Sequence, residues 1–335
     1  MSKAINTFTE LAPGDVEHYL LWTGEDSPEY QNNFSVTRSF SDGTLSRIQD
    51  VRRFARSVQP DLILAHSSWA GFYARLGIKD IPVIYQPHCY VFEDKSRSLL
   101  SRGVFYAAEK VLSLNTKATV VLSPRENKLS RSLNPLVSTI MLPNVNSLGI
   151  VYQEKTDKEL ENFIAGKSGQ RTTISMLGRI TRQKDPHWFL EAVKIYRRAF
   201  PQQQADFLWI GDGDEETRKQ LEEAGITVTG WKNSSEIRQI LEGTDIYLHS
   251  ASYEGFPLAV LDALSLDIPA LVRGIPAYEG TSLKLVSSPA EAANQLGRLA
   301  ESNQEKIKLI KQQRQLMKTM NQETQAEAIR KILSH

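Results

Sequence analysis

Short apolar runs recur along this 335-residue chain, and amphipathic stretches of helix length separate them. The runs lie at residues 62–64, 83–85, 119–122, 174–177, 207–210, 226–228, 246–248 and 270–272. Strands this short and this apolar are typical of parallel sheets that helices cover on both faces. The sequence therefore predicts an α/β fold built from repeated strand–helix–strand units.

The length predicts two domains, because a single hydrophobic core stops growing well before 335 residues. We expect an N-terminal domain at 1–150, a polar linker at 151–171 and a second domain at 172–318. Within the linker, the Gly-Lys-Ser-Gly-Gln run at 166–170 predicts a flexible hinge. Residues 319–335 are expected to form a C-terminal helix that packs back on the N-terminal domain.

The start of the chain departs from the usual pattern of such domains. Residues 4–11 read as a helix and residues 16–22 as the strand that follows it. A doubly wound domain normally begins with a strand and a glycine-rich turn ahead of that helix. We therefore expect the N-terminal domain to lack its first strand.

Composition excludes several classes of partner and location. A formal charge of +1 gives no indication of a nucleic-acid partner. The single cysteine, Cys89, rules out an internal disulfide framework and fits a reducing compartment. There is no signal-peptide pattern at the N-terminus and no apolar run long enough to span a bilayer. We expect a cytoplasmic protein, or one attached peripherally to the inner face of a membrane.

One candidate binding loop follows the predicted strand at 174–177. Gly178 allows a tight turn, and Arg179 and Lys184 lie five residues apart in the same loop. An arginine fork matches phosphate oxygens, and a lysine supplies a point charge. Two ordinary surface cations are the alternative interpretation.

A second loop, Gly211-Asp212-Gly213-Asp214, allows two interpretations. The two aspartates could hold Mg²⁺ or Mn²⁺ on a diphosphate. Alternatively, the run is a tight turn followed by a helix that Asp214 caps. We favour the turn and cap, and we predict no metal site.

The third loop, from Glu254 to Leu258, is the most specific. The chain turns at Glu254-Gly255, and Pro257 sits where a helix can begin. N–H groups at such a helix start form a ready anion site. Asp262 lies about two turns into that helix, so both carboxylates can face one ligand.

Together these loops resemble the retaining glycosyltransferases of family 4. The resemblance rests on Gly-Arg-x4-Lys, then a Gly-Asp-Gly turn, then Glu-Gly-Phe-Pro-Leu with an acidic residue eight positions after the glutamate. It is dense from about 172 to 275 and moderate from 60 to 145. It implies the GT-B fold, in which two Rossmann-like domains face each other across a cleft, with the acceptor on the N-terminal side and the donor on the C-terminal side.

The resemblance also assigns roles to residues. It places Arg179 and Lys184 on the donor diphosphate and gives Glu254 the contact with sugar hydroxyls near the reacting carbon. It assigns Asp262 to the ribose, where the family normally has a longer glutamate. The diphosphate site that it implies is completed by Gly178, Gly255, Phe256, Pro257 and Leu258.

Two histidines that follow strands in the first half are further candidates. His88, in Tyr-Gln-Pro-His, resembles the family's active-site histidine, which contacts the donor sugar. His66 could line the acceptor side. A lone histidine after a strand is more often structural.

The implied activity is transfer of a hexosyl or other glycosyl group from a UDP- or GDP-linked sugar, with retention of configuration and without a metal or a cofactor. The acceptor, which could be a glycan, a lipid-linked glycan or a small molecule, is left open. The main alternative is a non-catalytic GT-B protein that binds a sugar, nucleotide or protein partner. A dinucleotide-dependent oxidoreductase is disfavoured, because no Gly-x-Gly-x-x-Gly opens either half.

Residues 95–131 combine many cations with interleaved apolar side chains. Such a basic amphipathic surface could dock on anionic lipid, which would suit a lipid-linked acceptor. The alternative is an ordinary helix that packs on the sheet and leaves its basic face in solvent, and we favour it.

Overall fold

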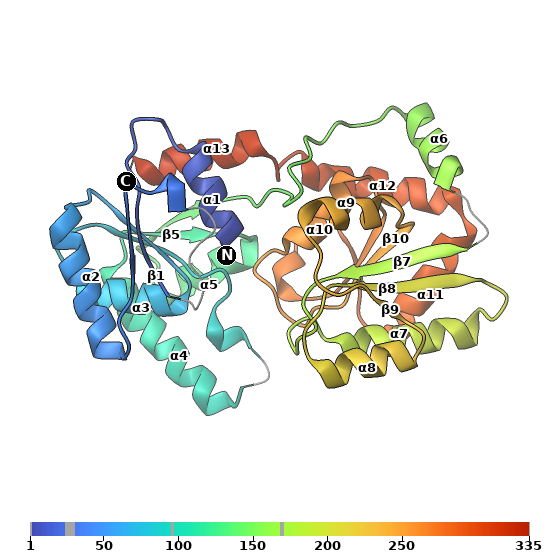
Figure 1. Cartoon of the computed structure of the whole chain (residues 1–335), viewed down its shortest axis with the longest axis horizontal. Coiled ribbons are helices and arrows are strands. Elements are labelled where there is room, and N and C mark those ends of the chain that lie inside the picture. The colour runs from blue at the N-terminus through green and yellow to red at the C-terminus, as the bar shows by residue number, and fades with distance from the viewer. Residues whose placement is uncertain (1, 24–30, 95–96, 168–170, 335) are drawn as a thin grey trace. The chain divides into compact units, whose positions relative to one another are not determined.

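The computed structural model describes residues 2–23, 31–94, 97–167 and 171–334. The chain divides into two compact units, one formed by Met1–Asn144 with Gln322–His335 and the other by Val145–Asn321. Each unit is built from parallel strands with helices packed against them, and Figure 1 shows the two units in their chain colours. The predicted α/β class with two Rossmann-like domains is confirmed.

The second unit contains one six-stranded parallel sheet in the order β12-β11-β10-β7-β8-β9. The strand order reverses between β7 and β10, because β8 and β9 follow β7 on one side while β11 and β12 follow β10 on the other. In doubly wound folds, ligands bind at the carboxyl ends of the strands at such a switch point. The strands are β7 (Thr172–Leu177), β8 (Ala205–Ile210), β9 (Thr227–Val228), β10 (Ile246–His249), β11 (Ala270–Arg273) and β12 (Lys284–Val286).

Helices cover both faces of this sheet (Figure 1). Strand β10, on one side of the switch point, is the most deeply buried strand of this sheet, and all four of its residues are inaccessible to solvent. This burial explains the uninterrupted apolar runs in the sequence. The helices are α6 (Asp157–Lys167), α7 (Pro186–Ala199), α8 (Glu215–Glu223), α9 (Ser234–Glu242), α10 (Leu258–Ser265), α11 (Pro289–Glu301) and α12 (Asn303–Met317), with a 3₁₀ turn, η4, at Pro276–Tyr278.

The segment expected to be a linker, 151–171, belongs by its packing to the second unit. Leu160 and Ile164 of α6 pack with Ile310 of α12. Residues 168–170 of the expected hinge lie outside the described residues.

A buried carboxylate, Asp267, holds this segment in place. It accepts hydrogen bonds from Lys155 Nζ at 2.6 Å and Tyr152 OH at 3.2 Å, and it pairs with Arg314 Nε at 3.3 Å. The Asp267 and Arg314 side chains are 1% and 5% exposed. The segment that follows Val145 is therefore fixed to α12 through charge as well as through apolar contact.

The first unit contains two separate parallel sheets, of order β1-β2 and β3-β4-β5-β6. The strands are β1 (Tyr19–Trp22), β2 (Val36–Ser39), β3 (Ile63–His66), β4 (Val83–Gln86), β5 (Ala118–Val121) and β6 (Ser138–Met141). The helices are α1 (Ser2–Leu11), α2 (Thr44–Val58), α3 (Ser68–Gly77), α4 (Leu99–Leu112), α5 (Pro124–Leu133) and α13 (Gln322–Leu333), with 3₁₀ turns η1 (Gln31–Asn33), η2 (Val91–Glu93) and η3 (Ser113–Asn115).

The last helix, α13, is part of the first unit (Figure 1). Its residues Ala328, Ile329 and Ile332 share a core cluster with Phe8 of α1 and with the apolar side chains of β4 and β5. Gln325 also donates to the carbonyl of Pro143 at 2.9 Å. The end of the chain thus contributes to the core of the domain in which the chain begins.

The gap between the two sheets of the first unit is the place of one strand that is missing from the described part of the chain. The common doubly wound order, 3-2-1-4-5-6, places the first strand between the second and the fourth. Here β1 pairs with β2 on one side, β3 pairs with β4 on one side, and no described strand joins β1 to β3. Among the described residues the expected first strand is absent, as the sequence predicted.

The solvent-facing side of helix α4 differs from the basic face expected from the sequence. Its inward side carries Phe105 and Tyr106, which pack on Tyr90 and Phe92, and the buried Glu109 pairs with Arg75. Its outward side is largely apolar, with Leu99, Leu100, Val104 and Val111 between 60% and 81% exposed and the exposed Lys110 beside Val111. Leu114, just beyond the helix, is 80% exposed. Lys95, at the start of the expected surface, lies outside the described residues.

We predict that Asp267→Ala destabilises the chain by about 3–5 kcal/mol, because the buried Arg314 loses its buried partner and keeps, of its ion pairs, only the 3.8 Å contact with the half-exposed Glu154. Asp206→Ala is the matched control, since the Asp206–Arg171 pair is about half exposed on both sides and should contribute less than about 1 kcal/mol. Urea unfolding of both variants measures the difference. Equal losses would contradict the anchoring role of Asp267.

Candidate functional site

Three loops at the carboxyl edge of the second unit's sheet carry most of the predicted site residues. They follow β7, β8 and β10, and β7 and β10 are the strands on either side of the switch point. The predicted residues therefore lie at the edge where a doubly wound sheet binds its ligand.

Glycines allow the loops after β7 and β8 to pack backbone against backbone. A Cβ on Gly211 would lie 2.3 Å from the carbonyl oxygen of Gly178, and one on Gly213 would lie 2.2 Å from that of Ile180. Both glycines have positive φ, at 137° and 158°. At Gly178 a Cβ would come 3.1 Å from Cε of Lys184, so the lysine stem crosses this residue. The Gly-Asp-Gly run thus shapes the loop that carries Arg179 and Lys184.

The turn-and-cap interpretation of the second loop is confirmed. Asp214 caps α8 by accepting from Thr217 N at 2.9 Å, and Asp212 pairs with Arg218 at 2.8 Å. In the described part of the chain there is no group of three or more His, Cys, Asp or Glu side chains placed to hold a metal ion.

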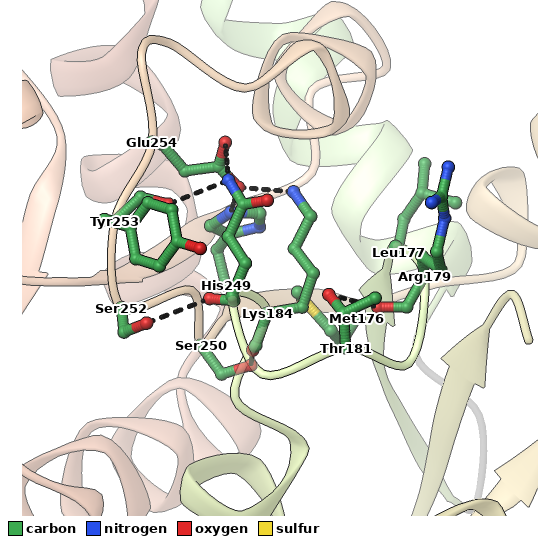
Figure 2. A network of polar contacts seen from close by, with 12 residues as sticks. Met176, Leu177, Arg179, Thr181, Lys184, His249, Ser250, Ser252, Tyr253 and Glu254 are labelled. Atoms are coloured by element: carbon green, nitrogen blue, oxygen red, sulfur yellow. Dashed lines mark hydrogen bonds and ion pairs between the residues drawn. The ribbon is translucent and has the colours of Figure 1, made fainter. Parts of the chain in front are cut away.

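An ion pair joins the loop after β7 to the loop after β10. Lys184 Nζ pairs with Glu254 Oε1, and both side chains are largely buried, at 17% and 10% exposure. Gln183 Nε2 donates to Glu254 Oε2 at 3.3 Å and to the Tyr253 carbonyl at 3.1 Å. Figure 2 shows the side chains of Lys184 and Glu254 pointing toward each other, with a dashed line that marks their contact. The structure therefore brings together two residues to which the resemblance gave separate roles.

Arg179 is oriented differently from these two. It is exposed and forms no ion pair with any residue that the structure describes. Its side chain extends from the loop in the same direction as that of Lys184 in Figure 2. Its guanidinium is therefore available to an anion in solution.

The start of α10 is built as the sequence predicted, with one shift. Pro257 is the N-cap residue and Leu258 the first residue of the helix, and no side chain caps its first turn. Phe256 is 4% exposed and packs edge-on against Tyr278, with ring centroids 5.8 Å apart. An uncapped helix start has a partial positive charge that an anion can neutralise.

Asp262, expected at the ribose, is 1% exposed and faces the chain itself. Ser147 donates to its carboxylate twice, from the backbone N–H to Oδ1 and from Oγ to Oδ2 at 2.8 Å. A ligand that used this carboxylate would have to share it with Ser147.

His249 is a residue that the sequence analysis missed. It ends β10, is fully buried, and directs Nε2 toward Glu254 Oε1 at 3.6 Å. Its Nδ1 lies 3.0 Å from the hydroxyl of Tyr247, and Nε2 has no hydrogen-bond partner. The sequence feature that could have identified it is a titratable side chain at the end of an otherwise apolar strand.

Opposing effects act on the pKa values of these groups. Burial pushes the pKa of Glu254 upward, but His249 and the Lys184 ammonium outweigh it, so the pKa of the carboxyl is lowered. Burial lowers the pKa of His249, and Lys184 lowers it further, against the opposing effect of Glu254. Near neutral pH, Glu254 is therefore ionised and His249 is neutral.

The two candidate histidines of the first unit contact each other. His66 ends β3 and His88 follows β4, with Nδ1 of His66 3.0 Å from Nε2 of His88. Their rings stack with centroids 5.3 Å apart. His88 has φ of 60°, a conformation that is uncommon for a residue with a Cβ.

Neither of these histidines readily accepts a proton. Desolvation lowers the pKa of His88 to about 4. Desolvation, with a smaller contribution from the neighbouring His88, lowers the pKa of His66 to about 3. At neutral pH both rings are neutral, and one ring N–H donates to the other ring's nitrogen.

Two family models match the chain in succession. The one described as "Glycosyl transferase 4-like domain" matches residues 11–144, and the one described as "Glycosyl transferases group 1" matches residues 171–302. The chain is 25% identical over 293 residues to the UDP-Gal:alpha-D-GlcNAc-diphosphoundecaprenol alpha-1,3-galactosyltransferase of Escherichia coli. That alignment covers 79% of this chain and 74% of the relative.

Solved structures resemble the whole chain. Sucrose-phosphate synthase from Thermosynechococcus elongatus superposes with a TM-score of 0.77 at 16% identity, covering 98% of this chain and 91% of that one. Anabaena Alr3699/HepE, solved in complex with UDP and glucose, gives a TM-score of 0.74 at 14% identity, with coverage of 99% and 95%. At these identities the likeness concerns the fold.

We predict that the His66–His88 pair makes stability depend on pH. A histidine whose folded pKa is lowered binds a proton more readily when unfolded, so folding free energy is lost as pH falls below about 6.5. Between pH 7 and 5 the wild type should lose roughly 3–4 kcal/mol more than the His66→Gln/His88→Gln double variant, because both histidines contribute. Urea unfolding at both pH values measures this slope. His187→Gln, at an exposed histidine, should leave the slope unchanged.

Proposed function

The chain belongs to the glycosyltransferases of family 4, with the GT-B fold, and on that basis we propose that it transfers a hexosyl or other glycosyl group from a UDP- or GDP-linked sugar. We propose retention of anomeric configuration, which is typical of the family, and a reaction that needs neither a metal nor a cofactor. The single observation that carries the proposal is the placement of Arg179, Lys184 and Glu254 on loops at the switch point.

In this proposal the second unit stabilises the leaving group. Cleavage of the bond between sugar and phosphate builds negative charge on the departing nucleoside diphosphate and positive charge on the sugar. Arg179 and Lys184 supply fixed positive charges, and the uncapped start of α10 adds the partial charge of its N–H groups. Gly178 and the run Gly255-Phe256-Pro257-Leu258 let the backbone approach the phosphates.

The remaining residues act on the sugar and the nucleoside. Glu254 accepts hydrogen bonds from sugar hydroxyls near the reacting carbon, and the resemblance assigns His88 to the same sugar. Asp262 binds the ribose together with Ser147, whose hydroxyl already contacts the carboxylate. The aspartate is shorter than the family's glutamate, and the bound serine extends its reach toward the ribose.

A non-catalytic protein of the same fold is the alternative function. The observation that favours it is that Ser147 contacts both carboxylate oxygens of Asp262. Such a protein would bind a nucleotide sugar without turning it over when a competent acceptor is present.

The donor site is tested by thermal stabilisation with a panel of nucleoside diphosphates and nucleotide sugars, and by mass detection of released nucleotide. We expect one base series to stabilise the chain. Arg179→Ala should weaken binding of that series by about 10–100-fold, because it removes a charged hydrogen bond worth about 1.5–3 kcal/mol. Arg182→Ala, an exposed arginine on the same loop, is the control and should bind as the wild type does.

Three outcomes separate the proposals. Turnover that survives EDTA and disappears in Arg179→Ala supports the metal-independent enzyme. Binding without turnover on any glycan or polyprenyl-diphosphate-linked acceptor favours the non-catalytic protein. No stabilisation by any nucleotide would overturn both.

We propose a lipid-linked acceptor, reached at the surface of an anionic membrane. The E. coli relative is named for an acceptor on diphosphoundecaprenol. In this chain the outward face of α4 presents Leu100, Val104 and Val111 at helical spacing, with the exposed cation Lys110 beside them. Apolar side chains flanked by lysine and arginine suit the headgroup region of anionic lipid. No helix among the described residues is long and apolar enough to cross a membrane.

We expect the wild type to co-sediment with vesicles that contain anionic lipid and to be released by high salt. The Leu100→Glu/Val104→Glu double variant should lose this binding at least tenfold, because it places two carboxylates on the contact face. Leu136→Glu is the control, since Leu136 is 94% exposed outside α4. Unchanged binding of the double variant would contradict the assignment of this face.

A further inference from the structure

His249 lies beneath the proposed donor site but contacts no solvent. It is completely buried at the end of β10, and its Nε2 is directed toward Glu254 Oε1 at 3.6 Å, too long for a hydrogen bond. Nε2 has no other partner among the described residues. Buried polar groups are normally hydrogen-bonded, so an unpaired nitrogen beside a functional carboxylate indicates a role.

The surrounding atoms determine where the neutral ring carries its proton. The backbone N–H of Leu177 donates to the Tyr247 hydroxyl at 3.3 Å, so that hydroxyl can donate its own proton to His249 Nδ1 at 3.0 Å. Nδ1 is then an acceptor, and the ring proton sits on Nε2, facing the carboxylate. The opposite tautomer would direct a lone pair at a negative charge.

The same hydroxyl lets the ring gain a second proton. Tyr247 OH also lies 3.4 Å from the carbonyl oxygen of Leu177. When the hydroxyl donates to that carbonyl instead, its oxygen accepts from a protonated Nδ1. Burial raises the pKa of Tyr247, so the phenol keeps its own proton throughout. The site can therefore accommodate imidazolium by rotation of one O–H bond.

In the structure the ammonium of Lys184 lies opposite Glu254 (Figure 2). The proposed function gives Lys184 to the donor diphosphate, and the inference below rests on that function. Once Lys184 turns to the diphosphate, Glu254 is a buried carboxylate without a cation. A buried charge in that state costs several kcal/mol unless another partner forms.

We propose that His249 is a positioning residue that takes up one proton from solvent as Lys184 moves to the donor diphosphate, and that the imidazolium then holds Glu254 for the sugar. One cation replaces another at the carboxylate, so the charge beside Glu254 is conserved. The ring closes the 3.6 Å gap to hydrogen-bond distance and fixes the carboxylate relative to β10.

The sign of the resulting pH dependence follows from the groups around His249. They are Tyr247 on β10, Glu254 on the loop after it, Lys184 on the loop after β7, and Tyr278 in η4, which lies near the same carboxylate. When Lys184 moves away, the cation that lowers the pKa of His249 is gone. The negative charge of Glu254 then raises that pKa without opposition from Lys184. Because binding takes up a proton, the donor should bind more tightly as pH falls, by up to tenfold per pH unit.

Calorimetric titration with UDP-glucose, or with GDP-mannose if the panel responds to guanine, measures the proton directly. The nucleotide sugar is preferred to the free diphosphate, whose terminal phosphate titrates near pH 6 itself. Titration at pH 7.5 in buffers of different ionisation enthalpy should give uptake of close to one proton per donor bound. Binding with no buffer dependence would overturn this inference and leave the proposed function intact.

Two variants test the role of the ring separately from its role in packing. His249→Gln keeps an N–H near Glu254 but cannot titrate, so donor binding should weaken yet stay measurable, while proton uptake falls to near zero. Tyr247→Phe keeps the packing and removes the acceptor for protonated Nδ1, so uptake should fall there too. Proton uptake that persists in both variants would place the titrating group elsewhere.

His187→Gln removes an exposed histidine at the start of α7 and is the matched control, which should retain the wild-type uptake. If His249 had only a structural role, replacing it would change stability but neither proton uptake nor the pH dependence of donor affinity. Absence of binding heat with either nucleotide sugar would instead be a failure of the proposed function.

Discussion

The ion pair between Lys184 and Glu254 connects two loops whose residues lie 70 positions apart in the chain. It forms because β7 and β10, although separated by β8 and β9 in sequence, are neighbours in the sheet. The close backbone approach of Gly178 to Gly211 supports the first loop from one side, and Ser250 Oγ donates to the Lys184 carbonyl at 2.6 Å from the other. The lysine and the carboxylate balance each other's charge in this pair, so a ligand that took Lys184 as its partner would have to redistribute that charge.

That balance links the electrostatics of the site to its chemistry. A lysine that is held by a carboxylate attracts phosphate less than a free one, so in the proposed function part of the donor's binding free energy goes into separating the pair. What is gained is a carboxylate that stays ionised in a buried place, because Lys184 and His249 together lower the pKa of Glu254. In the same proposal, Arg179, exposed and without an ion partner among the described residues, attracts the donor diphosphate at longer range.

Local patterns predicted much of this architecture. The apolar runs located β3, β4, β5, β7, β8, β9, β10 and β11, and turn chemistry gave the cap at Asp214. The strands β2, β6 and β12 gave no comparable signal, because they lie at sheet edges and carry polar residues such as Arg38, Ser138 and Lys284. Contacts between segments that are distant in the chain could not be predicted from local patterns either. Ser147 meets Asp262 across 115 residues, and only the folded chain shows that the outward face of α4 is apolar.

The break between β1 and β3 has a consequence for how the chain behaves in a crowded solution. Each of these strands pairs on one side, and β1 consists of Tyr-Leu-Leu-Trp, without a proline or a charged residue to protect its other edge. Natural sheets usually guard such edges with lysine, proline or a bulge, because an open row of N–H and C=O groups templates further strands. A short aromatic and aliphatic segment is also the composition that stacks into ordered aggregates. The edges of β1 and β3 that face this break are therefore the places in the first unit that are open to pairing with a further extended strand.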